Sequence, residues 1–197
     1  LVAKHFVVFL FFFISGLFFC LILRKLIDNE NFYILGSIIY LTYPYLFGQS
    51  MFSPKDIPFM SIWLICTFLS FVLIEQIIQK NKIEIKYTII FSILSAYLLS
   101  IRIAGILIFI QYLIVLICYL NLYKVSSIKF LNKYFKDLIL FSLVFICFLF
   151  LFYPTFWINP LLLIESIKVN SSHFNNVGTT TFGEIMYSQN LPITYLI

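Results

Sequence analysis

The chain has 197 residues and a net charge of +5; 62% of its residues are hydrophobic and only 11% are charged. Soluble domains carry about 25% charged residues, so a water-soluble globule is excluded, because it would expose large apolar patches. The basic residues are scattered between apolar runs instead of clustering with aromatic residues on one face, which excludes a nucleic-acid-binding surface. The composition therefore predicts an all-α integral membrane protein.

Long apolar runs follow one another along most of the chain. A helix that spans a bilayer needs about 20 apolar residues. Six runs reach or approach this length, and in chain order they cover residues 6–23, 32–48, 57–78, 87–101, 103–123 and 138–153. They predict a polytopic bundle over residues 1–157 with about six complete transmembrane helices.

The run from residue 87 to residue 123 needs a break. As one helix it would extend about 55 Å, well beyond a hydrocarbon core of roughly 30 Å. Arg102 and the flexible Gly105 lie in its middle, in the sequence SIRIAG, so we predict a tight turn there.

The distribution of charge supports six spans. With that count, nine basic residues fall on one side of the membrane: Arg24, Lys25, Lys80, Lys82, Lys86, Lys124, Lys129, Lys133 and Lys136. The other side holds Lys4, Lys55, Arg102 and Lys168. Because the basic side of a membrane protein is cytoplasmic, residue 1 and the turn at Arg102 are expected outside.

The C-terminal part changes in composition. Asn, Ser, Thr and Gly replace Phe and Ile over residues 158–190, which predicts an external loop with a short interfacial helix at 160–169. Residues 191–197 are expected to begin a seventh transmembrane helix. Since the chain begins with Leu1, we expect it to be part of a longer protein.

Three charged residues are predicted at the outer face. Lys55 and Asp56 lie on one outside turn, between Pro54 and Pro58, and Arg102 lies on the next. The helices that join these turns are linked by a short loop, so we expect the three charges to share one pocket. Simpler readings stay open: Asp56 caps a helix, Lys55 extends to the interface, and Arg102 only anchors the topology.

Several segments resemble a known family. The sequences FSPKDIP, around Asp56, and the series WINP, FGE and LPITY further on are its more specific parts. Together with the order of spans, they resemble the dolichyl-phosphate-mannose protein mannosyltransferase-like branch of membrane glycosyltransferases with the C-type fold. Bacterial relatives in that branch include the aminoarabinose transferase that acts on lipid A.

The resemblance implies a glycosyltransferase that takes a sugar from a polyprenyl-phosphate donor at the outer face of the membrane. The acceptor is a lipid, glycan or protein, and the bacterial inner membrane is the expected location. In the family, a base is expected on a large external loop, which here would precede Leu1. Asp56 matches an acidic residue at the outer start of a later span, and Arg102 matches a basic residue at an outer turn.

The chemistry of such a donor suits these side chains. The leaving group is an anionic phosphate, which Lys55 and Arg102 would bind, while Asp56 is a candidate catalytic residue and a candidate ligand of a divalent metal ion. A transporter or flippase of lipid-linked substrates is the alternative, and it predicts charged or broken helices near the bilayer midplane. A purely structural membrane subunit would not need these clustered charges.

Overall fold

The computed structural model describes residues 2–157, 159, 165, 178–181 and 184–187. The chain divides into two compact units, Leu1–Tyr153 and Pro154–Ile197. In the described part of the first unit all regular elements are helices: α1 (Val2–Leu26), α2 (Glu30–Thr42), α3 (Pro44–Ser50), α4 (Asp56–Lys80), α5 (Ile85–Ile101), the 3-10 helix η1 (Ile103–Leu107), α6 (Ile108–Leu122) and α7 (Ser127–Phe152).

Four of these helical stretches are long and apolar enough to cross a membrane: Ala3–Leu26, Asp56–Lys80, Ile103–Leu122 and Ser127–Phe152. The chain is therefore helical and compatible with a multi-pass membrane protein. The helix α5 is apolar but shorter, and α2 and α3 are shorter still. The count of six spans is not confirmed.

The second predicted span, residues 32–48, is not one continuous helix. It is interrupted at Tyr43, whose φ of −60° and ψ of 117° are extended, and α3 begins at Pro44. A residue before proline is disfavoured in the helical region, and proline has no N–H to continue the helix. The prediction of a single helix here is wrong, and the signal for the break was local.

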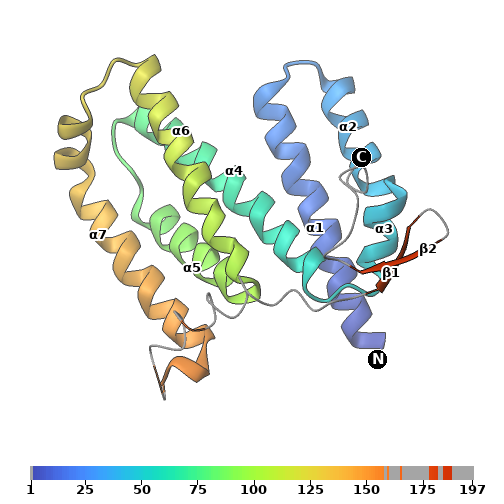
Figure 1. The fold of residues 1–197 in the computed structure, drawn as a ribbon. Helices are drawn as coiled ribbons and strands as arrows, with labels where there is room; N and C mark the ends of the chain where they lie inside the picture. The colour runs from blue at the N-terminus through green and yellow to red at the C-terminus, as the bar shows by residue number, and fades with distance from the viewer. Residues whose placement is uncertain (1, 158, 160–164, 166–177, 182–183, 188–197) are drawn as a thin grey trace. The chain divides into compact units, whose positions relative to one another are not determined.

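The break predicted at Arg102 is confirmed. The backbone of Arg102 is extended, with φ −148° and ψ 138°, and it ends α5. The chain then turns through η1, where the Gly105 N–H donates to the Arg102 carbonyl at 2.8 Å. The turn leads directly into α6, and the hydroxyls of Ser95 on α5 and Tyr112 on α6 are hydrogen-bonded at 3.0 Å (Figure 1).

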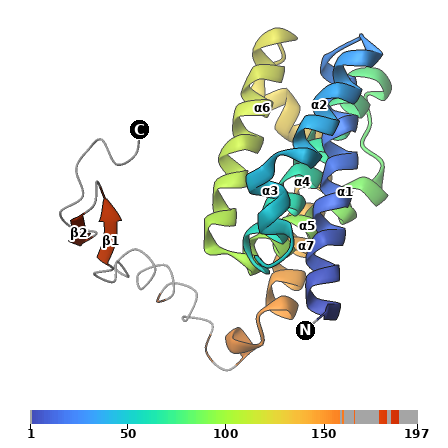
Figure 2. The same cartoon turned by 90° about the vertical axis from the view of Figure 1, so that its right-hand side faces the viewer.

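The core of the first unit lies between α1, α4 and α5. The helix α1 packs against α2 and α4, and α5 packs against α4 and α7 (Figure 1). In the view of Figure 2, α1, α2 and α6 run nearly along one direction. Small polar side chains are fully buried where the helices meet, among them Ser15, Ser61, Ser92 and Ser95. Small residues let helix backbones approach closely when no water drives the association.

Basic side chains collect at one end of the first unit. This end, here named the basic end, contains the link from α1 to α2 and the link from α6 to α7 (Figure 1). Lys25 on α1 pairs with Glu75 on α4 there, and Lys133 on α7 donates to Asn81, which follows α4. Asp56, Arg102 and the start of α1 lie at the opposite end. Among the described residues, Arg102 thus lies at the other end from Lys25 and Lys133, as the sequence predicted, while the assignment of these ends to membrane sides stays a prediction.

A chain of hydrogen bonds between polar side chains, here named the polar chain, joins α4 and α6 inside the apolar bundle. The Trp63 indole N–H donates to Gln111 Oε1 at 2.8 Å, and Gln111 Nε2 donates to Thr67 Oγ1 at 2.9 Å. Gln111 therefore satisfies groups on the facing helix that lipid could not satisfy.

Replacing Gln111 by Leu is expected to destabilise the bundle by about 1 kcal/mol, because Trp63 loses its acceptor and Thr67 loses a donor. Thermal unfolding of the detergent-solubilised protein measures this change. Asn121→Leu is the matched control, since Asn121 is exposed at the far end of the same helix. Equal effects of the two substitutions would remove the stabilising role of the polar chain.

The second unit is described in part. It begins with the 3-10 helix η2 (Pro154–Trp157) and contains an antiparallel pair of strands, β1 (Gly178–Thr181) and β2 (Glu184–Tyr187), in which Thr179 faces Met186. These strands depart from the all-α prediction. The predicted helix at 160–169 and the span from 191 onward lie outside the described residues.

Candidate functional site

The structure brings together two of the three charged residues that the sequence singled out. The Arg102 guanidinium donates to Asp56 Oδ1 and forms an ion pair with it. Asp56 begins α4, and Arg102 ends α5, so the contact joins residues 46 positions apart at the same end of the unit. Both side chains are about half exposed, at 50% for Arg102 and 55% for Asp56.

Lys55 lies beside this pair and is exposed. Its backbone forms the N-cap of α4, and its side chain makes no ion pair within residues 2–157. The ammonium group is therefore available at the same edge of the bundle. The shared location predicted for Asp56 and Arg102 is observed, and Lys55 is adjacent through the chain.

The interpretation of Asp56 as a helix cap is wrong. The N-cap is Lys55, and no side chain accepts a capping hydrogen bond there. Instead, the two carboxylate oxygens of Asp56 accept from Arg102 and from the Ser53 hydroxyl, the latter at 2.9 Å. The Asp56 carboxylate therefore accepts hydrogen bonds from two side chains that lie outside α4, those of Ser53 and Arg102.

Ser53 is a member of the site that the sequence reasoning missed. It is 8% exposed, and its hydroxyl reaches Asp56 three residues further along the chain. The signal was present in FSPKDIP, since a hydroxyl residue three positions before an acid commonly bonds it in a turn. Pro54, between them, limits the conformations that this turn adopts.

The turn before α4 is also hydrogen-bonded to α1. The ring of His5, on α1, donates a hydrogen bond to the Met51 carbonyl. In η1, Gly105 lies so close to α5 that an added Cβ would be 2.9 Å from the Leu98 carbonyl oxygen. The two turns that carry Asp56 and Arg102 are thus positioned by α1 and by tight backbone packing.

An apolar groove begins next to the charged pair. It has a volume of about 430 Å³ and lies between α1, α4 and α5. Pro54 and Ile101, the chain neighbours of Lys55 and Arg102, line it together with Val7, Phe11 and Tyr97. Lys4 is the charged residue that lines the groove, and the Asp56–Arg102 pair lies next to it in the chain fold. Charged groups beside an apolar groove suit a ligand with a charged head and a hydrocarbon tail.

No group of three or more His, Cys, Asp or Glu side chains that could hold a metal ion occurs among the residues that the structure describes. Asp56 offers one carboxylate. Mg²⁺ is commonly held by one or two carboxylates together with substrate phosphates, so a divalent ion at Asp56 stays a prediction.

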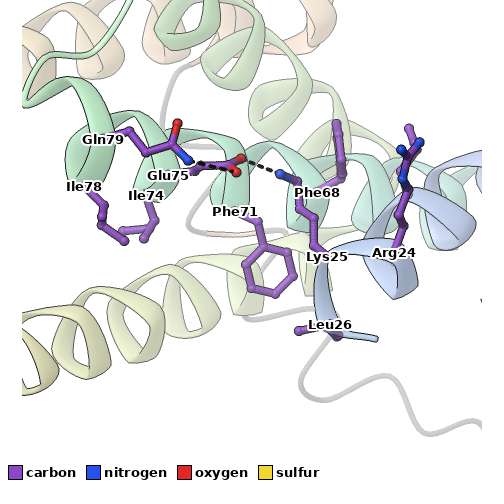
Figure 3. A pocket seen from close by; sticks show the side chains of 10 residues that line it. Arg24, Lys25, Leu26, Phe68, Phe71, Ile74, Glu75, Ile78 and Gln79 are labelled. Atoms are coloured by element: carbon purple, nitrogen blue, oxygen red, sulfur yellow. Dashed lines mark hydrogen bonds and ion pairs between the residues drawn. The ribbon is translucent and has the colours of Figure 1, made fainter. Parts of the chain in front are cut away.

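A second pocket lies at the basic end, between α1 and α4, with a volume of about 590 Å³ (Figure 3). The Lys25 ammonium points at the Glu75 carboxylate there, and Gln79 Nε2 lies 3.5 Å from Glu75 Oε1. The Lys25 Nζ also lies 5.8 Å from the Phe68 ring centroid. The Lys25–Glu75 pair links α1 to α4 across this pocket, and Arg24 lines the pocket as well.

Comparisons with known proteins add no assignment: no family model, no curated protein and no solved structure matches the chain. The candidate site is therefore supported only by the chemistry of its residues and by their geometry.

Proposed function

We propose that the protein is a membrane glycosyltransferase that moves a sugar from a polyprenyl-phosphate donor to an acceptor at the outer face of the membrane. The observation that carries the proposal is the Asp56–Arg102 pair beside an apolar groove, which Pro58, two residues after Asp56, and Ile101, next to Arg102, help to line. A donor of this class has a phosphate beside a long hydrocarbon chain, and such a site offers a place for each part.

The reaction places negative charge on the leaving group. An acceptor hydroxyl attacks the anomeric carbon, the bond from that carbon to the phosphate oxygen breaks, and the polyprenyl phosphate departs. Arg102 and Lys55 stabilise the departing phosphate, since cationic groups aimed at developing charge lower the barrier. Asp56 orients the Arg102 guanidinium and is the candidate, among the described residues, for the base that takes the hydroxyl proton.

The distribution of charge along the helices favours this reading over a transporter or flippase. Transport pathways place ionisable groups near the bilayer midplane. In α1 and α4, the Lys, Arg, Asp and Glu side chains lie within the first or last six residues, and α6 has none. A divalent metal ion, a lipid, glycan or protein acceptor and a bacterial inner-membrane location belong to the proposal.

Substitution of Arg102 tests the proposal. In the full-length protein, Arg102→Lys is expected to lower kcat/KM for a polyprenyl-phosphate sugar by about tenfold to hundredfold, because lysine loses the bidentate geometry that guanidinium offers a phosphate. Transfer of a radiolabelled sugar in proteoliposomes measures this effect.

Arg24→Lys is the matched control, since Arg24 is exposed at the basic end, away from the groove. We expect it to leave donor use within a factor of about two. Wild-type donor use in Arg102→Lys and in Arg102→Ala would reduce Arg102 to a topology anchor. Full-length protein that transfers no sugar from any polyprenyl-phosphate donor would refute the proposed activity as a whole.

A further inference from the structure

The helix α7 is longer than a membrane span requires. It has 26 residues, and its backbone departs from helical geometry at Tyr134, with φ −102° and ψ 16°. Residues 135–152 alone extend about 27 Å, close to the thickness of a hydrocarbon core. If residues 135–152 span the core, the part before the kink would lie at the level of the lipid headgroups, with Lys136 at the border of the core.

The side chains before the kink divide into three faces. Phe130 and Tyr134 are buried, at 7% and 5% exposed, and pack on Ile77 near the end of α4. The exposed apolar face carries Ile128 and Leu131, at 71% and 48% exposed. The third face carries Lys129 and Lys133, and Lys136 follows two residues after the kink. Residues four apart share one side of a helix, so Lys129 and Lys133 lie on the same side.

The surroundings of this segment are also basic. Residues 80–86 and 124–137 together contain seven lysines and two carboxylates. Glu84 pairs with both Lys80 and Lys86, and these two ammonium groups hold the pKa of the Glu84 carboxyl below its usual value. Lys129 and Lys136 have no ion pair within residues 2–157. Most of the positive charge therefore remains uncompensated.

An apolar groove continues from this segment along the outer side of α7. It has a volume of about 480 Å³, and side chains on both sides of the kink line it, from Leu131 and Phe135 to Leu143. Lys133 and Lys136 are the chain neighbours of Asn132 and Phe135, which line the start of the groove. An anionic phospholipid matches this arrangement, because its phosphate would meet the lysines while an acyl chain follows the groove into the span.

We propose that the first part of α7, residues 127–136, is an interfacial segment that binds an anionic phospholipid. Lys129, Lys133 and Lys136 bind the headgroup phosphate, and Leu131 and Phe135 contact the acyl chain. The site lies at the basic end, away from Asp56 and Arg102, and the proposal is independent of the transferase activity. The Figure 3 pocket at the same end is less suited, since Glu75 pairs with Lys25 there and Arg24 is its one other basic side chain.

Lipid retention tests the proposal. The detergent-purified chain is incubated with phosphatidylglycerol or phosphatidylcholine of identical acyl chains, and bound lipid is counted by native mass spectrometry. We expect wild type to prefer phosphatidylglycerol, and Lys129→Gln/Lys136→Gln to weaken its retention by about tenfold. This variant keeps the contact between Lys133 and Asn81, so the fold is expected to persist. Unchanged circular dichroism and unfolding temperature check that expectation.

The matched control is Arg24→Gln/Lys82→Gln, which removes the same charge from the same end of the unit and breaks no ion pair recorded within residues 2–157. We expect it to retain phosphatidylglycerol like wild type. An equal loss in both double variants would show a diffuse attraction and overturn the assigned site, as would equal retention of the two lipids by wild type. Displacement of the lipid by excess soluble glycerol phosphate would overturn a lipid as the occupant.

Discussion

Asp56→Asn is expected to reduce sugar transfer by about a hundredfold or more while the unfolding temperature stays close to that of wild type. Asparagine keeps the size of the side chain and accepts from the Ser53 hydroxyl, but it removes the charge that pairs with Arg102. Losing one preorganised polar group in an active site commonly costs a hundredfold to a thousandfold in kcat. A half-exposed ion pair contributes only about 0–1 kcal/mol to stability.

The measurement combines transfer in proteoliposomes with thermal unfolding of the same preparations. Glu75→Gln is the control, because it removes one carboxylate from an ion pair at the opposite end of the unit, with Lys25. We expect this control to transfer sugar like wild type. An Asp56→Asn protein that is stable and fully active would leave Asp56 with a structural contact and no role in transfer.

Gly105→Ala is expected to destabilise the first unit by about 1–3 kcal/mol, since the added methyl group would overpack the turn. Its Cβ would lie 2.9 Å from the Leu98 carbonyl oxygen and 2.9 Å from the Leu99 Cα. Both are backbone atoms of α5, so a side-chain rotation cannot relieve the clash. Because Gly105 donates to the Arg102 carbonyl, the displaced turn is expected to lower transfer as well.

Gly48→Ala is the matched control for this loss of stability. Gly48 lies in α3, and an added Cβ there meets no atom within 4 Å. Since alanine is favoured over glycine in a helix, this substitution is expected to be neutral or to stabilise by about 0.5–1 kcal/mol. Thermal unfolding of both variants in detergent measures the difference. Equal unfolding temperatures would show that the turn at Arg102 adapts to the added methyl group.

Much of the candidate site was within reach of sequence reasoning. Asp56 and Arg102 were predicted on two turns at the same face, at the outer ends of two helices that a short loop connects. This implied that the two residues lie close together, and in the structure they form an ion pair. The same reasoning did not find Ser53, although its spacing from Asp56 was a local signal. It also assigned no partner to Glu75, because Lys25 lies 50 residues away and nothing local connects the two.

The sequence located the apolar helices and the turn at Arg102, because backbone hydrogen bonding, apolar length and turn residues act locally. It missed the break at Tyr43 and the part of α7 that precedes residue 138. Pro44 carried a similar local signal for the break at Tyr43. Only the tertiary structure decided which faces meet. The helices α1 and α4 are apolar on all sides, so their sequences do not mark a face for the bundle. The contact of Gln111 with Trp63, the ion pair between Lys25 and Glu75 and the kink at Tyr134 arise from how those faces pack.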